Sequence, residues 1–127
     1  MIDTNPQVVC NLIELAREFH AQQEVSIDDE PEGLGHDTEA QVLQQHAGDP
    51  VLEEFRSVVE DLAPQEQQQV VALLWLGRGD YEMDEWDDAV TYAEEAWTPT
   101  TADYLIAHPM LAEHLRVGLE QHGHSCD

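Results

Sequence analysis

The spacing of apolar residues along the chain predicts helices and no strands. Apolar positions recur at helical spacing over residues 6–22, 50–62, 64–76, 84–97, 101–107 and 109–121. No segment alternates apolar and polar residues over the length of a strand. We therefore predict an all-α fold: a single compact domain over residues 1–127, with about six helices in an orthogonal helical bundle and no sheet.

The most apolar of these segments predicts the centre of the core. Residues 70–76 (VVALLWL) are apolar on every side, which is typical of a fully buried helix, and Gly77 is expected to end that helix. Trp75 lies in this segment, and Trp86 lies on the apolar stripe of the next helix. We expect the two tryptophans to be buried against each other's helices.

Two segments differ from the helices around them. Residues 24–37 are acidic and interrupted by glycine and proline, which predicts a mobile loop. A short helix capped by Thr38 and Gln41 is expected to follow this loop. Residues 122–127 carry no apolar pattern, so we expect a frayed tail.

The charge of the chain excludes two classes of partner. There are 28 acidic residues against 4 arginines and no lysine, giving a formal net charge of -24. Nucleic acids and anionic membrane surfaces both require clustered basic residues, so neither is expected as a partner. Because the acids are spread along the whole chain, the composition favours halophilic adaptation to a salt-rich cytoplasm. A basic protein partner and mimicry of DNA are the alternatives.

The location predicted from the sequence is cytoplasmic. No apolar run reaches the roughly 20 residues that a membrane span needs, and the first residues show no basic segment followed by an apolar core. Cys10 and Cys126 could form a disulfide if the two ends of the chain meet. The cytoplasmic location favours free thiols instead.

Several motifs resemble one known family. They are LLWLGRGDY at residues 73–81, DEW at 84–86, TADYL at 101–105 and PMLAEHL at 109–115. With these motifs the chain resembles the bacterial family described as domain of unknown function 3775. The resemblance implies a small helical bacterial protein and brings no activity, cofactor or catalytic residue with it. The chain departs from the family pattern at Ala63, where a capping serine is expected, and at His108, where threonine is expected.

Arg78 is the most distinctive charged residue. It stands between two glycines in a predicted turn, and its guanidinium is expected to bind Asp80, Asp84 or carbonyl groups at the helix end. Binding of an anionic ligand by Arg78 is the alternative. We take Arg78 and Asp80, with Trp75 and Trp86, as interaction or structural residues.

Two segments carry weak patterns for metal ions. Asp28, Glu30, Glu32 and Glu39 have the spacing of a calcium-binding EF-hand loop, although glutamate replaces shorter ligands and Pro31 stiffens the segment. The tail offers His122, His124 and Cys126, which are ligand types for zinc, without a second ligand pair elsewhere. We expect no cofactor, with calcium or zinc as the alternative.

The sequence carries no recognisable catalytic constellation. None of the three serines lies in a strand-turn-helix elbow, and a phosphate-binding loop is excluded because lysine is absent. We therefore predict a non-catalytic binding or protein-interaction module that recognises a protein partner through an apolar groove or an acidic face. A divalent-metal-binding protein is the second hypothesis, and an enzyme of another type is the third. Whether the chain forms a homodimer is left open.

Overall fold

The computed structural model describes residues 2, 4–26 and 49–126, and of residues 22–26 it describes the backbone only. The elements are α1 (Pro6–Ser26), α3 (Pro50–Asp61), α4 (Pro64–Arg78), the 3-10 helix η2 (Met83–Glu85), α5 (Trp86–Ala96), α6 (Thr101–Ile106) and α7 (Leu111–Gln121). No strand occurs in this part of the chain, so the predicted all-α fold is confirmed. A bilayer-spanning helix is not found among the described elements.

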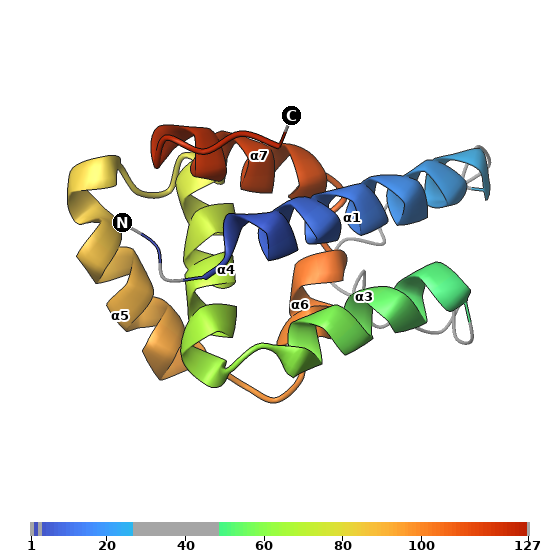
Figure 1. Ribbon diagram of the computed structural model, residues 1–127, viewed down its shortest axis with the longest axis horizontal. Helices are drawn as coiled ribbons and strands as arrows, with labels where there is room; N and C mark the ends of the chain where they lie inside the picture. Colours follow the sequence, from blue (N-terminus) through green and yellow to red (C-terminus); the bar gives the residue numbers. More distant parts are fainter. Residues whose placement is uncertain (1, 3, 27–48, 127) are drawn as a thin grey trace, which may run out of the picture.

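Helix α4 is the centre of the bundle. It packs against α7, which crosses one end of it, and against α5, which lies along its side (Figure 1). Every residue from Gln67 to Leu76 is buried. For residues 70–76 this burial was predicted, whereas that of the three glutamines before them was not. The buried amide of Gln67 is satisfied because its Nε2 donates to the carbonyls of Val59 and Leu62. Helix α1 packs against α7 and α3, which completes the core.

The end of α4 corrects one prediction. The helix does not stop at Gly77 but continues to Arg78, and Gly79 provides the left-handed residue that ends it, with φ 96°. Gly77 serves a different purpose, because a Cβ at this position would overlap the backbone carbonyl of His114 in α7. A glycine there lets the backbones of α4 and α7 approach closely.

The substitution Gly77→Ala tests this close approach. In an unobstructed helix interior, alanine in place of glycine stabilises by roughly 0.5–1 kcal/mol. Here the methyl group meets backbone and not a flexible side chain. We therefore expect the opposite sign, a loss of about 1–3 kcal/mol in the free energy of unfolding, as for an overpacked core. Urea unfolding of the two proteins measures it, and a variant more stable than the parent would contradict the packing.

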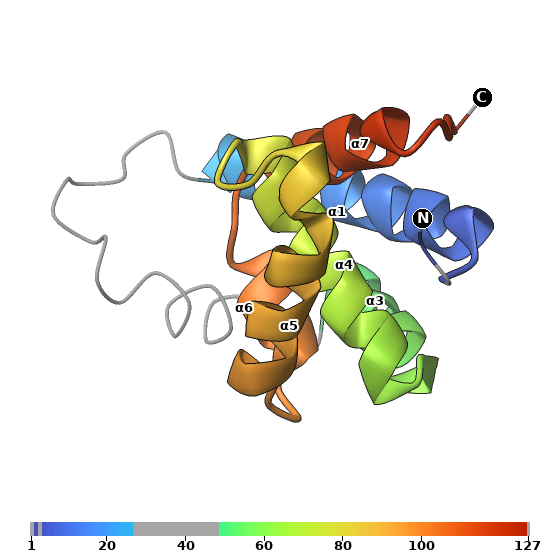
Figure 2. The same cartoon turned by 90° about the vertical axis from the view of Figure 1, so that its left-hand side faces the viewer.

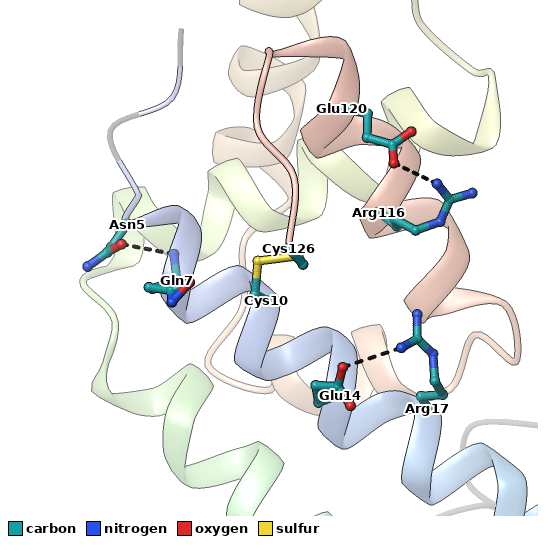
Figure 3. The surroundings of a disulfide bond; sticks show 8 residues. All are labelled: Asn5, Gln7, Cys10, Glu14, Arg17, Arg116, Glu120 and Cys126. Carbon is teal, nitrogen blue, oxygen red and sulfur yellow. Dashed lines mark hydrogen bonds and ion pairs between the residues drawn. A yellow bond between two sulfur atoms is a disulfide. The ribbon is translucent and has the colours of Figure 1, made fainter.

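A second prediction, that the two cysteines are free thiols, is corrected because they form a disulfide. Cys10 in α1 is bonded to Cys126, with their Cα atoms 5.5 Å apart (Figure 3). The expectation of free thiols is therefore wrong. It relied on a presumed compartment, whereas the packing of α1 against α7 brings the segment after α7 to Cys10.

The segment after α7 is also held in place, so the predicted frayed tail is wrong for residues 122–126. The ring of His122 meets Trp86 edge to face, with ring centroids 4.3 Å apart. The backbone amide of His124 donates to the carbonyl of Leu119, and the disulfide ties Cys126 to α1. Three contacts to three different elements fix this short segment.

Candidate functional site

A cavity of about 710 Å³ opens between the second half of α4, α5 and the start of α6. Figure 2 views the molecule from the side of α5, with α4 behind it and α6 beside it. The apolar part of the lining is Val71, Trp75, Tyr81, Tyr92, Ala93, Ala96, Trp97 and Tyr104, and the polar part is Arg78, Asp80, Thr98, Thr100 and Thr101. We call this cavity the aromatic cleft. Its volume lies within the range of small-ligand sites, about 300–1,000 Å³.

The cleft gathers most of the large aromatic side chains of the protein. The chain has three tyrosines and three tryptophans. All three tyrosines and two of the tryptophans line the cleft, although they come from α4, α5, α6 and the turns between them. Aromatic side chains with a polar atom are enriched where proteins bind partners, because one face can pack while the other end stays hydrated.

Trp75 lines the cleft and contacts all three of its tyrosines. Its indole Nε1 donates a hydrogen bond of 3.0 Å to the hydroxyl of Tyr104. The ring of Tyr81 stacks on it at 6.0 Å between centroids, and the ring of Tyr92 lies tilted against it at 5.4 Å. Trp75 is only 7% exposed, whereas Tyr92 is 56% exposed. Tyr92 therefore presents a ring to solvent on a rigid aromatic support.

The two ends of the cleft are polar. At one end, Nε and Nη2 of Arg78 donate to the same carboxylate oxygen of Asp80, at 2.9 and 2.6 Å. Asp80 is one of the partners predicted for Arg78 from the sequence. At the other end, Thr98 accepts from the amide of Thr100 and its carbonyl accepts from the hydroxyl of Thr101. Both ends are thus ordered by local hydrogen bonds and frame the aromatic rings.

His108 contacts Tyr104, one of the residues that line the cleft. Its ring packs edge to face on the ring of Tyr104 at 4.8 Å, and its Nδ1 is 2.9 Å from the carbonyl of Tyr104. Burial lowers the pKa of His108 below its usual value, and the nearby charge of Arg78 acts in the same direction. The ring is therefore neutral at pH 7. The buried, neutral His108 contributes fully to the free energy of unfolding above pH 6.5, which is about the pKa of histidine in the unfolded chain. This contribution is lost as the pH falls below that value.

Two exposed acidic residues lie beside Tyr92 without a basic partner among the described ion pairs. Asp88 and Glu95 are exposed in α5 and lie one turn before and one turn after Tyr92, which places them beside its ring on the helix surface. From residue 79 to residue 115 the sequence contains no lysine or arginine. Among the described residues, the ion pairs of the four arginines involve neither Asp88 nor Glu95. Two carboxylates without a basic partner among the described ion pairs therefore flank Tyr92 on the surface of α5.

The structure separates the two tryptophans that the sequence grouped. Trp75 and Trp86 are both buried, each 7% exposed. Trp75 contacts the helix of Trp86 through Tyr92 and also lines the cleft, whereas the ring contact found for Trp86 is with His122. Trp75 and Arg78 with Asp80 thus meet at one site, and Trp86 has a structural position near the end of the chain.

The metal candidates fall into two groups. The residues proposed for calcium (Asp28, Glu30, Glu32 and Glu39), like the predicted loop 24–37 beyond residue 26 and the short helix after it, lie outside the described residues. In the tail, Cys126 is bonded to Cys10 and has no thiolate to offer while the disulfide is closed. Within the part of the chain that the structure describes, no three His, Cys, Asp or Glu side chains form a group that could hold a metal ion.

Sequence reasoning missed the tyrosines of the cleft. Tyr81, Tyr92 and Tyr104 belong to a turn and two different helices, and helical periodicity compares residues only within one helix. The available signal was compositional: five of the six tyrosines and tryptophans lie between residues 75 and 97, and the sixth follows at residue 104. Such a concentration favours a shared site, but only the packing of α5 and α6 on α4 brings the rings together.

One comparison with known proteins gives a match. The model of a family described as "protein of unknown function (DUF3775)" matches residues 52–124, which is more than half of the chain and includes every residue that lines the cleft. No curated protein and no solved structure matches.

Proposed function

We propose that this chain, which belongs to the DUF3775 family of proteins of unknown function, is a non-catalytic binding module. Its ligand occupies the aromatic cleft. The observation that carries this proposal is the convergence of all three tyrosines and two tryptophans on one cavity of about 710 Å³. A cavity with apolar walls and a few fixed polar groups is the usual form of a ligand site. The lining has no nucleophile with an adjacent base, which supports binding and not catalysis.

The design of the cleft supports recognition of a partner. Tyr92 is the exposed ring, so it is available to a ligand, while the buried ring of Trp75 holds it in place. Rings that are already packed lose little conformational entropy when a ligand binds, which favours affinity. The ordered turns at both ends of the cleft act in the same way.

A screen of small organic molecules by two-dimensional NMR tests the proposal. The three indole N–H signals report on three positions, because Trp75 and Trp97 line the cleft and Trp86 does not. We expect ligands that bind to shift the signals of Trp75 and Trp97 and to leave that of Trp86 unchanged. Ligands that shift only Trp86, or a screen that finds no molecule able to shift Trp75 or Trp97, would overturn the proposal.

The variant Tyr92→Ala makes this test specific. Because Tyr92 is largely exposed, its loss should change the melting temperature by only a few degrees while weakening binding about tenfold or more, as for a hot-spot tyrosine. Met110→Ala is the matched control, since Met110 is 55% exposed against 56% for Tyr92 and does not line the cleft. This control should bind like the parent, and equal losses in both variants would contradict a site at the cleft.

We also propose a salt-rich cytoplasm as the place of action. The supporting observation is a net charge of -24 with no lysine. The Cys10–Cys126 disulfide argues against this location, because the cytoplasm keeps thiols reduced. Trapping the thiols in intact cells and measuring the oxidised fraction tests it; a fully oxidised pool would place the protein in an oxidising compartment. The alternative metal-binding function finds no support among the described residues.

A further inference from the structure

We infer that the occupant of the aromatic cleft is a basic segment of a partner protein that inserts an arginine side chain against Tyr92. This inference rests on the proposed function and specifies the chemistry of its ligand. It combines three observations: the sign of the charge around the cleft, the exposed aromatic ring inside it and the size of the cavity.

The charge around the cleft selects a cation. Asp88 and Glu95 flank Tyr92 on the surface of α5, and neither is in an ion pair among the described residues. The single positive charge of the lining, Arg78, is neutralised by Asp80. A cleft at the surface of a protein with a net charge of -24 concentrates positive ligands and repels anions.

The aromatic ring selects a guanidinium over an ammonium group. A cation over the face of tyrosine or tryptophan is attracted by the ring quadrupole, and arginine does this more often than lysine. The guanidinium is planar and weakly hydrated, so it stacks on a ring at a lower cost of desolvation. Tyr92 offers such a ring, and the carboxylates one turn away on either side can accept the guanidinium N–H groups.

The size of the cleft and the hydroxyl proton of Tyr104 indicate that the ligand is a peptide segment. About 710 Å³ exceeds what one cationic group fills, so neighbouring residues of the ligand would enter as well. The Tyr104 hydroxyl already accepts from Trp75, and in the described part of the chain no acceptor is found for its own proton. That proton is available to a backbone carbonyl of a bound segment.

The competing occupant, an anion held by Arg78, is disfavoured by the same geometry. Two of the donor nitrogens of Arg78 are already bound to Asp80, at 2.9 and 2.6 Å. An anion would have to displace this carboxylate and enter a negative field. The structure therefore gives Arg78 the role of holding Asp80 at the end of the cleft.

Calorimetry with three short peptides tests the inference on the full chain with its disulfide closed. The peptides share one small, uncharged framework with capped ends, and differ in two positions that are both arginine, both lysine or both citrulline. Citrulline has nearly the shape of arginine without its charge. We expect the arginine peptide to bind about tenfold tighter than the lysine peptide, because it stacks on Tyr92. The citrulline peptide should bind weakest.

Variants of Tyr92 separate stacking from simple apolar contact. Tyr92→Phe keeps the ring face and should bind the arginine peptide within about twofold of the parent. Tyr92→Leu keeps an apolar side chain without a ring and should lose about tenfold. Equal affinity of the Phe and Leu variants would overturn the inference. The melting temperatures of both variants check that each is folded.

Variants of the flanking acids separate the site from the overall charge. Asp88→Asn with Glu95→Gln should weaken binding several-fold and flatten its dependence on NaCl. The matched control, Glu18→Gln with Glu54→Gln, removes two exposed charges on α1 and α3 and should bind like the parent. Equal weakening in both double variants would show attraction to the net charge alone and would overturn the inference.

The remaining outcomes distinguish this inference from the proposed function. If the citrulline peptide binds as tightly as the arginine peptide, or if tetramethylammonium displaces the arginine peptide at equal concentration, the inferred occupant is wrong while the cleft remains a binding site. If neither the peptides nor the molecules of the NMR screen perturb Trp75 and Trp97, the proposed function fails as well.

Discussion

Reduction of the Cys10–Cys126 disulfide is expected to lower the free energy of unfolding by about 4–5 kcal/mol. The bond joins residues that are 116 positions apart, so it closes nearly the whole chain into one loop. Cross-linking a loop of about 100 residues removes enough entropy from the unfolded chain to stabilise the folded state by about 4.7 kcal/mol. Because small domains have a total free energy of unfolding of only about 5–15 kcal/mol, the reduced protein should retain little stability.

Urea unfolding with and without a reductant measures this effect. The variant Cys10→Ser with Cys126→Ser should unfold like the reduced parent, and reductant should leave its unfolding curve unchanged. This second comparison removes any direct action of the reductant. A reduced parent within about 1 kcal/mol of the oxidised one would mean that the cross-link does not restrict the unfolded chain as the loop model requires.

The same bond has a local consequence at the end of the chain. It holds the segment that places His122 against Trp86, and burial lowers the pKa of His122 below its usual value. Opening the bond removes one of the contacts that fix this segment. The fold around the aromatic cleft is built by α4, α5 and α6, none of which carries a cysteine. Opening the disulfide therefore affects the cleft through the overall stability of the fold and not through a direct contact.

The sequence predicted the helices well where the apolar pattern was strong. The segment 70–76 is apolar on all sides, and it became the centre of α4 because only a helix surrounded by others can bury such a surface. The prediction failed where a glycine had two readings. Gly77 fits a helix end as well as a close approach between backbones, and only the position of His114 in α7 decides between them.

The site was predicted only in part, because it depends on contacts between elements. Arg78 and Trp75 were selected from local features, and both line the cleft. The tyrosines were not selected, since nothing within one helix connects Tyr92 to Tyr104. The disulfide shows the same limit: two cysteines near opposite ends can be paired only when the packing of α1 on α7 is known.

The melting temperature is expected to rise steeply with NaCl between about 0.01 M and about 1 M. We propose that the acidity is a halophilic adaptation, and the charge distribution provides the physical basis. Each of the four arginines is already in an ion pair with glutamate or aspartate, so the other acids described have no basic side chain to offset them. Their mutual repulsion destabilises the compact state.

The expected size of this effect follows from the charges. Two carboxylates about 10 Å apart in water repel each other by about 0.4 kcal/mol, and a few tens of such pairs sum to roughly 10 kcal/mol. The Debye length falls from about 30 Å at 0.01 M salt to about 3 Å at 1 M, so most of this repulsion is screened at the higher concentration. The unfolded chain is also repelled, but its charges are farther apart, so the folded state gains more from screening.

A series of melting temperatures from about 0.01 to about 2 M NaCl at constant pH measures the salt effect. Sorbitol at matched osmolarity is the uncharged control, and it should produce a much smaller rise because it does not screen charge. The double variant Asp87→Asn with Glu94→Gln, two exposed acids of α5 outside the cleft, should melt higher than the parent at low salt and equal to it at 1 M. A flat or falling series would remove the case for halophilic adaptation. It would leave recognition of a basic partner as the physical reason for the acidity, because such a domain is stable at low salt and its complex weakens as salt is added.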